Sequence, residues 1–243
     1  MNKQPIEKRV RTFDGLLEVH SVFYTIQGEG PFTGTPCVFV RLAGCNLQCP
    51  GCDTDYTSKR VFHGVQSLIA RITNEFDGRG DGRRLVVITG GEPFRQDLTQ
   101  LLIHLPKLGF YVQIETNGSF ELPLGLPFNQ NIGERRGVYV VCSPKTPTIH
   151  NNYHIHACAF KYVLDHGSVD PEDGLPHTVL DNHTGRKVAR PKAPFMGEIY
   201  LQPMDHGSDN PISNRKNVRA VVRSCLQHGY LLQLQIHKLI GVE

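Results

Sequence analysis

The chain has 243 residues, of which 39% are hydrophobic and 20% are charged, and its formal net charge is only +3. This charge is too small to indicate nucleic-acid binding, and no apolar run approaches the ~18 residues that a membrane span needs. The polar start MNKQPIEKRVRTFDG lacks the apolar core of a secretory signal, so we expect a cytoplasmic protein. The length suits a single domain over residues 1–243, with residues 1–15 as a polar N-terminal extension.

A series of apolar and β-branched runs predicts strands along the whole chain. In chain order these runs are 18–26, 36–42, 84–89, 110–116, 137–143, 159–164, 198–203 and 231–240. Many of them are continuously apolar, which is typical of strands that are buried on both faces.

Three segments between these runs carry apolar residues at helical spacing. The stripes are Val65, Leu68, Ile69, Ile72 and Phe76; Leu98, Leu101, Leu102, Leu105 and Leu108; and Val218, Val221, Val222, Cys225 and Leu226. Strands that alternate with helices indicate a mostly parallel sheet. Since the strands outnumber the helices, we predict an α/β fold in the form of an incomplete TIM-like barrel.

Two links lack a helical stripe and are rich in Pro, Gly and charge, namely residues 119–136 and 165–197. We therefore expect loops or short turns in place of crossover helices. The 165–197 link is long for a loop, which predicts either a functional flap or a mobile polar insertion.

Polar or glycine-rich signatures follow the predicted strands. They are the cysteine loop GCNLQCPGCDTDYT (residues 44–57), GGEP (90–93), TNG (116–118), SPK (143–145) and PMD (203–205). Gly, Pro, Asn and Asp also occur in ordinary turns, so each signature alone is weak. Their joint position at the C-terminal ends of strands predicts an active site, because that rim carries the active site in parallel α/β barrels.

The cysteine loop contains Cys45, Cys49 and Cys52. The chain has seven cysteines, and an odd number in a chain of this length argues against a disulfide framework. A zinc site would need a distant fourth ligand such as His63, whereas a [4Fe–4S] cluster on three thiolates would leave one iron open to a ligand. The other cysteines are isolated in sequence and are expected to be core thiols: Cys37, Cys142, Cys158 and Cys225.

The Cys-x3-Cys-x2-Cys spacing at a strand end resembles that of the radical S-adenosylmethionine (SAM) enzymes. In that superfamily the open iron chelates SAM, and an electron from the cluster cleaves SAM to a 5′-deoxyadenosyl radical. The ordered motifs TIQGEG, CDT, ITGGEP, ETNG, SPK, KYV, LQPMD and LQLQIHKLIGV further resemble the 7-carboxy-7-deazaguanine synthases, over roughly residues 16–243.

This resemblance implies a ring contraction. The family converts 6-carboxy-5,6,7,8-tetrahydropterin to 7-carboxy-7-deazaguanine with release of ammonia, regenerates SAM and requires Mg²⁺. The product feeds the biosynthesis of queuosine and related deazapurines. The resemblance also implies an electron donor of flavodoxin or ferredoxin type and a homodimer.

Site residues follow from the resemblance, position by position. The cluster ligands are Cys45, Cys49 and Cys52, and the magnesium ligand is Thr54. The SAM contacts are Gly51, Cys52, Asp53, Gly91, Ser143, Pro144, Lys145, Gln202, Pro203, Met204 and Asp205. The substrate contacts are Ile26, Gln27, Gly28, Arg41 and Thr89, with Glu29, Glu115 and His237 as further candidates.

Side-chain chemistry supports several of these roles. Arg41 can grip a carboxylate with two parallel hydrogen bonds, and Gln27 can both donate to and accept from a pterin edge. The hydroxyl of Thr54 suits a hard cation that keeps several waters. Asp53, in contrast, also favours turns, and Lys145 could be a solvated cation.

Two other functions remain open from the sequence. A glycyl-radical-enzyme activase would share the radical chemistry but act on a protein loop. A zinc-stabilised binding module would have no catalysis. Turnover of the pterin separates the first from the synthase, and the metal content separates the second.

Overall fold

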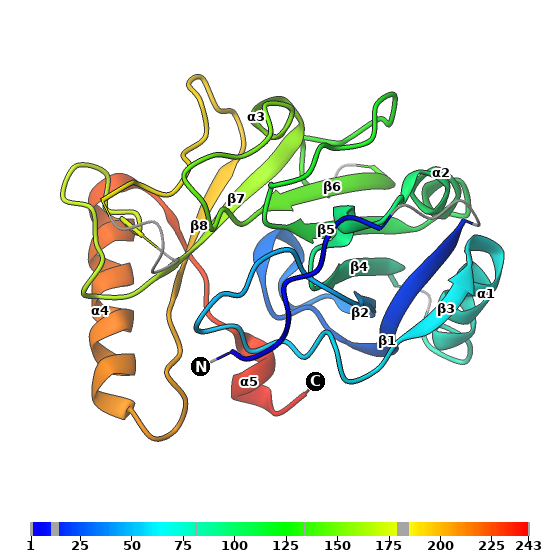
Figure 1. Ribbon diagram of the computed structural model, residues 1–243, viewed down its shortest axis with the longest axis horizontal. Helices are drawn as coiled ribbons and strands as arrows, with labels where there is room; N and C mark the ends of the chain where they lie inside the picture. Colours follow the sequence, from blue (N-terminus) through cyan, green and yellow to red (C-terminus); the bar gives the residue numbers. More distant parts are fainter. Residues whose placement is uncertain (1, 11–14, 81, 134, 179–184, 243) are drawn as a thin grey trace.

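The computed structural model describes residues 2–10, 15–80, 82–133, 135–178 and 185–242. Its centre is a nine-stranded sheet with the order β3-β1-β2-β4-β5-β6-β7-β8-β9 (Figure 1). Strands β2 to β9 are parallel along this order, while β1 is antiparallel to both β2 and β3. The sheet does not close on itself, so the predicted incomplete barrel is confirmed.

The strands are β1 (Leu16–Ile26), β2 (Pro36–Leu42), β3 (Val61–Gly64), β4 (Leu85–Gly90), β5 (Tyr111–Thr116), β6 (Gly137–Cys142), β7 (Ala157–Leu164), β8 (Glu198–Pro203) and β9 (Leu231–Leu232). The helices are α1 (Val65–Glu75), α2 (Thr99–Lys107), α3 (Tyr153–His156), α4 (Pro211–His228) and α5 (Ile236–Ile240), with short 3-10 turns η1 (Gly30–Phe32) and η2 (Pro93–Arg95). Among the described residues, helices are therefore fewer than strands, as predicted.

Alternation along each strand separates the two faces of the sheet. On β2, Val38, Val40 and Leu42 belong to the main core, which is shared with apolar residues of α1 and α2. Cys37 and Phe39 belong to a smaller cluster on the inner, concave face. Arg41 continues that inner face toward the C-terminal rim of the sheet, where a ligand can approach.

The third helical stripe is confirmed only in part, because Val221 is buried in the core and Cys225 packs against it while the other three residues are exposed. Helix α4 is present, but Leu226 is 84% exposed and Val218 and Val222 are also exposed. The buried side includes Asn217 and Ser224, because their side chains bind backbone groups: Asn217 bonds to His166 and Met204, and Ser224 to Gly174. Val221 in the core and these two polar anchors together orient α4.

The last predicted strand, 231–240, is also wrong over most of its length. Strand β9 covers only Leu231–Leu232, and Ile236–Ile240 form helix α5. Between them the side chain of Gln233 accepts from the Gly30 N–H at 2.8 Å and donates to the Gly28 carbonyl at 3.1 Å. Strand pairing ends at Leu232, and the chain beyond it is held instead by side-chain hydrogen bonds to the TIQGEG segment. These bonds hold the C-terminal segment beside the cavity described below.

The described parts of the 165–197 link are tied together by their own ion pairs, and they are bound to the body of the protein where the Tyr162 and Tyr230 hydroxyls donate to the Ala189 and Asp173 carbonyls, at 2.7 and 2.8 Å. Buried Asp170 forms ion pairs with Lys187 at 2.8 Å and His177 at 3.4 Å, and Arg190 binds Asp173 through two nitrogens. The prediction of a loop without a crossover helix holds over these residues. The stretch 179–184 of this link lies outside the described residues.

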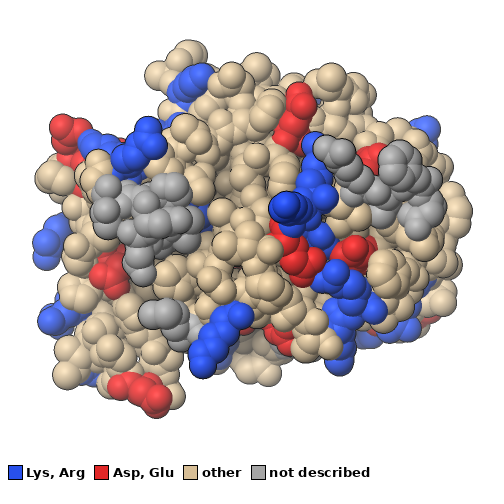
Figure 2. Space-filling view, viewed as in Figure 1, with Lys and Arg blue, Asp and Glu red and all other residues tan. Residues whose placement is uncertain are grey.

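Charged side chains of both signs are interspersed on the face seen in Figure 2. This mixture agrees with the small net charge of +3. None of the helices described here is both long and apolar enough to cross a membrane.

Candidate active site

The glycines of GGEP bring the end of β4 against the cysteine loop. A Cβ on Gly91 would lie 1.8 Å from the Gly44 carbonyl oxygen, and one on Gly90, at φ +119°, would lie 2.3 Å from the Leu42 carbonyl oxygen. Only glycine permits this approach. Gly91 therefore serves close backbone packing, and it does not line the cavity described below.

Glu92, next in GGEP, links three rim segments. It is fully buried and accepts hydrogen bonds from the Phe94 N–H at 3.0 Å, the Thr116 hydroxyl at 2.7 Å and the Asn117 N–H at 2.8 Å. Burial raises the pKa of Glu92 to about 7 despite these three donors. The bonds fix the ETNG segment relative to GGEP, a structural role that the motif alone did not indicate.

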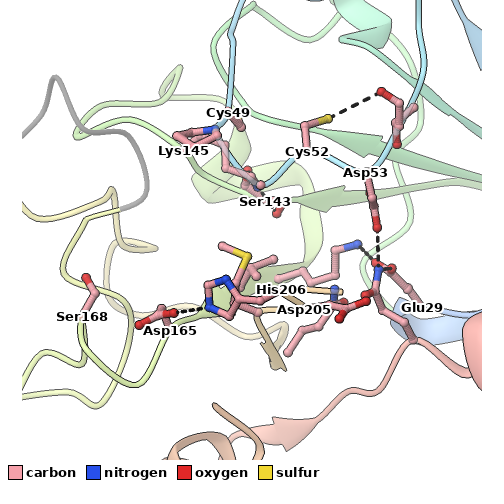
Figure 3. A pocket seen from close by; sticks show the side chains of 18 of the residues that line it. Glu29, Cys49, Cys52, Asp53, Ser143, Lys145, Asp165, Ser168, Asp205 and His206 are labelled. Carbon is pink, nitrogen blue, oxygen red and sulfur yellow. Dashed lines mark hydrogen bonds and ion pairs between the residues drawn. The ribbon is translucent and has the colours of Figure 1, made fainter. Parts of the chain in front are cut away.

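A cavity of about 930 Å³ opens at this rim (Figure 3). It brings together many of the predicted site residues: Glu29, Cys49, Gly51, Cys52, Asp53, Thr54, Glu115, Ser143, Lys145, Gln202, Met204 and Asp205. It also includes residues that sequence reasoning missed: Pro50, Lys161, Val163, Asp165, Gly167, Ser168, Thr178, His206, Gly207, Gln235 and Lys238. Four of the missed residues belong to motifs that were noted only as family markers, Lys161 and Val163 in KYV and Gln235 and Lys238 in the C-terminal set.

All seven cysteines lie in the described ranges, and none forms a disulfide. Cys49 and Cys52 line the cavity, while Cys45 is buried behind them. Burial raises the pKa of all three thiols, that of Cys45 to about 12. Within the described chain no set of three His, Cys, Asp or Glu side chains already converges as a metal site.

Lys145 places a positive charge beside these thiols. Its ammonium donates to the Ser143 carbonyl at 2.8 Å and to the Ser143 hydroxyl. Burial lowers the pKa of Lys145. Figure 3 shows Lys145, Ser143 and the two cysteines on one side of the cavity, facing Glu29, Asp205 and His206. Lys145 is thus partly buried in the cavity wall and bound to Ser143, and its contact with SAM stays a prediction.

A buried ion network forms the floor of the cavity. Lys161, whose side chain is 7% exposed, pairs with Glu29 and with Glu115 at 3.5 Å. Burial opposes ionisation of Glu29, but the charge of Lys161 and the hydrogen bonds from Lys161 and Gln235 together outweigh it and lower the pKa of this carboxyl. The same two carboxylates raise the pKa of Lys161 above its usual value, although burial acts the other way.

The C-terminal segment closes a second side of the cavity. Lys238 on α5 bridges Asp53 and Asp205, each at 2.9 Å, and Gln235 donates to Glu29 at 2.7 Å and to Asp53 at 3.2 Å. The cysteine loop, the PMD segment and the C-terminal motif are thereby joined at one edge.

Several predicted substrate residues lie near this floor but do not line the cavity. Gln27 is buried and donates to Glu115 at 2.9 Å. Gly28 makes room for His237, since a Cβ there would lie 2.0 Å from the imidazole Nδ1. The remaining predicted residues outside the lining are Ile26, Arg41, Thr89, Pro144 and Pro203.

Arg41 and Thr89 are nevertheless neighbours. They pair in register on β2 and β4, so both side chains fall on the inner face of the sheet. The Arg41 guanidinium also lies over the Phe23 ring, 5.3 Å from its centroid.

The groups at this site suit two kinds of binding partner: a soft metal, which thiolates bind, and a ligand that donates hydrogen bonds. Three free thiols stand on one loop, and the buried Oε1 of Gln202 at the cavity wall has no hydrogen-bond partner within the described residues. An acceptor left unpaired in a buried wall costs free energy unless a ligand binds it. A fourth protein thiolate at ligand spacing is missing from the sequence, which leaves a place for a bound cofactor.

An open barrel of mostly parallel strands with a cysteine loop at its C-terminal rim defines an α/β protein of the radical SAM type. The chain is 41% identical over 234 residues to the 7-carboxy-7-deazaguanine synthase of Rhodospirillum rubrum, covering 93% of this chain and 92% of that one. It is 34% identical to the enzyme of the same name from Rickettsia prowazekii and 30% identical to that of Aquifex aeolicus, over 93% and 96% of this chain and 89% and 97% of the relatives. The chain belongs to the 7-carboxy-7-deazaguanine synthase family.

The fold comparison agrees. A crystal structure of QueE from Escherichia coli matches with a TM-score of 0.64 and 25% sequence identity, covering 90% of this chain and 93% of that one. No family model matches the chain.

Proposed function

We propose that this chain is a lyase that converts 6-carboxy-5,6,7,8-tetrahydropterin to 7-carboxy-7-deazaguanine with release of ammonia, and that it uses SAM catalytically. One observation carries the proposal. A single cavity unites the cysteine loop with the SPK and PMD segments, the three places that the family resemblance assigns to cluster and SAM. Membership of the synthase family supports the same reaction.

Cys45, Cys49 and Cys52 would hold a [4Fe–4S] cluster, and Ser143, Lys145 and Gln202 would contact SAM. When bound, cluster and SAM supply a carbon-centred radical for hydrogen abstraction from the substrate. The protein's own part is to bind, orient and exclude water. The cavity wall offers donors at Lys145 and an unpaired acceptor at Gln202, which suits a ligand with both ammonium and carboxylate groups.

The inner face of the sheet supports a pterin carrying a carboxylate. Arg41 and Thr89 are adjacent there, and Glu115 is held by Gln27 and by Gln113, at 2.9 and 2.8 Å. A carboxylate fixed in this way can accept from the N–H groups of a pterin ring. Arg41 supplies the matching charge for the substrate carboxylate.

An anaerobic assay tests the function. Reconstituted protein is incubated with SAM, dithionite, Mg²⁺ and 6-carboxytetrahydropterin, and the products are separated by chromatography. We expect 7-carboxy-7-deazaguanine and ammonia in equal amounts, with SAM undiminished over many turnovers. Stoichiometric consumption of SAM without the deazapurine would refute the proposal and favour an activase.

Arg41→Ala is expected to weaken substrate binding by roughly 2–5 kcal/mol, because the substrate carboxylate would lose its charged partner. Cluster content and SAM binding should stay unchanged. Equilibrium binding of substrate and of SAM, measured separately, checks this. Arg41→Lys should recover only part of the loss, since an ammonium cannot make the two-pronged bond. Normal substrate binding with loss of SAM would show that Arg41 has another role.

Thr54→Ala is expected to raise the Mg²⁺ concentration needed for half-maximal turnover. Thr54 lines the cavity, and one neutral hydroxyl is an incomplete magnesium site until substrate adds oxygens. Magnesium should therefore bind weakly to free enzyme and more tightly with substrate present. Activity titrated against Mg²⁺ for both proteins decides the matter. Superimposable curves would exclude the ligand role, and loss of the cluster would indicate that Thr54 only braces the loop.

The resemblance further proposes an electron donor of flavodoxin or ferredoxin type and a homodimer. The length and the polar N-terminus propose a single domain over residues 1–243 and a cytoplasmic location. Assays with reduced flavodoxin in place of dithionite test the first. Sedimentation of the purified protein tests the second.

A further inference from the structure

The N-terminal extension lies across the cysteine loop. Its described part, residues 2–10, contacts the loop near both ends (Figure 1, dark blue against light blue). None of the sequence motifs includes this segment, so its contacts are new information from the fold.

The first attachment is at Cys45. Ile6 forms an isolated parallel β-bridge with Cys45, and the Glu7 N–H donates to the Cys45 carbonyl at 2.7 Å. The Glu7 carboxylate pairs with Arg60 at 2.6 Å and with Arg95 at 3.4 Å. Two arginines outside the loop therefore hold Glu7 in place.

The second attachment is at the other end of the loop, just beyond Cys52. The Gln4 carboxamide donates to the Thr54 carbonyl and accepts from the Tyr56 N–H, both at 2.8 Å. It thereby takes the place that a peptide group of a neighbouring strand would occupy. The Gln4 carbonyl also accepts from the Gln48 side chain at 2.7 Å, between the two attachments.

The loop needs such outside support. Residues 44–57 contain no helix or strand, and the Cys45 bridge to Ile6 is an isolated one. Within the loop, the Cys52 N–H donates to the Cys49 carbonyl at 3.2 Å and the Gly44 N–H to the Tyr56 carbonyl at 2.9 Å. An irregular segment with few bonds of its own takes its shape from what binds it.

We infer that residues 2–10 form a strap that positions the cysteine loop, with Gln4 and Glu7 as its positioning residues. The strap sets the relative places of Cys45 and Cys52 before any cluster is bound. The inference rests on the proposed function only in taking the loop as the cluster site. In the full chain, the strap should therefore slow the reaction of the Cys45 and Cys52 thiols with reagents from solution.

The test uses Gln4→Met, which keeps a side chain of similar length but removes the three loop contacts of the carboxamide, with Thr54, with Tyr56 and with the Thr57 hydroxyl, which donates to it at 3.1 Å. Lys3→Met is the matched control, because Lys3 is the exposed neighbour. Cluster-free full-length proteins are treated with iodoacetamide under argon, and modification of each cysteine is followed by mass spectrometry. Loss of these hydrogen bonds should speed alkylation of Cys45 and Cys52 by about tenfold in Gln4→Met.

Buried Cys37, Cys142 and Cys158 serve as internal controls. They should react equally slowly in all the proteins. Wild-type rates at Cys45 and Cys52 in Gln4→Met would overturn the inference. Faster reaction at the buried cysteines as well would also overturn it, because Gln4 would then stabilise the whole fold.

Iron release provides the second measurement. Reconstituted protein is mixed with a ferrous chelator, and Gln4→Met should lose iron several-fold faster than wild type and Lys3→Met. Gln4→Glu keeps the acceptor for Tyr56 but loses the donor to Thr54, so its rate should be intermediate. Equal release rates in all four proteins would contradict the strap. A wild-type protein that binds no iron would instead refute the proposed function, and the alkylation rates would still decide the role of residues 2–10.

Discussion

Cys49→Ala is expected to remove the bound iron and abolish turnover. Cys49 lines the cavity, and only three cysteines stand at ligand spacing in the loop, so no spare thiol can replace it. Wild-type protein should carry roughly four iron and four sulfide per chain, as a [4Fe–4S] cluster requires. The variant should lose this iron, the visible absorption and the electron paramagnetic resonance signal of the reduced cluster. Cys45→Ala and Cys52→Ala should behave in the same way.

Cys225→Ala is the control for these variants. Cys225 is a partly buried free thiol on α4, outside the residues that line the cavity. Iron and sulfide content should therefore match wild type. Full iron content in all three loop variants would disprove the cluster assignment. One zinc per wild-type chain would instead favour the zinc-stabilised module.

Lys161→Met is expected to destabilise the protein by about 3–5 kcal/mol at neutral pH, because it leaves two carboxylates at the cavity floor without their cation. The Glu29 and Glu115 carboxylates would then lie near each other with no positive charge from Lys161 to offset their repulsion. The midpoint of urea unfolding checks this. Lys107→Met, at an exposed position in the last turn of α2, should change stability by less than about 1 kcal/mol.

The pH dependence gives a second check on Lys161. In the wild-type protein the pKa of Glu29 is lowered, so its contribution to stability is present above the usual carboxyl pKa of 4.5 and is lost as the pH falls through the lowered value. In Lys161→Met, burial without a cation should raise the pKa of these carboxyls instead. The variant should then gain stability as the pH falls from 7 toward 5. The difference in the free energy of unfolding between Lys161→Met and wild type should shrink over this range. A difference that stays constant with pH would contradict the proposed ion network.

Local sequence signals determined the order of strands and helices and the chemistry at the rim. Continuously apolar runs have few alternatives to buried strands, and motifs after parallel strands must fall at one edge of the sheet. This is why Cys49, Cys52, Lys145 and Gln202 could be placed together in advance, and the structure does bring them to one cavity.

The exposed part of the α4 stripe and the last predicted strand differ from expectation for the same physical reason. Their apolar spacing was correct as a local pattern, but distant partners decided the outcome. Asn217 and Ser224 are buried because backbone groups of other segments bind them, and Gln233 ends strand pairing by bonding to Gly28 and Gly30. Hydrogen bonds between residues far apart in the chain produce no periodic pattern in the amino-acid sequence, so the spacing of apolar residues could not indicate them.

Only the tertiary structure showed the partners of the charged groups. Lys161 lies 132 positions from Glu29 and 46 from Glu115, and nothing in the KYV motif indicates that it neutralises both. The attachment of Gln4 to residues 54 and 56 is equally invisible in the sequence. The sequence by itself determined which chemical groups stand at the rim, because residue type and strand order are local properties. The fold decided which of them are paired, buried or left open to a ligand, because those properties depend on contacts between distant segments.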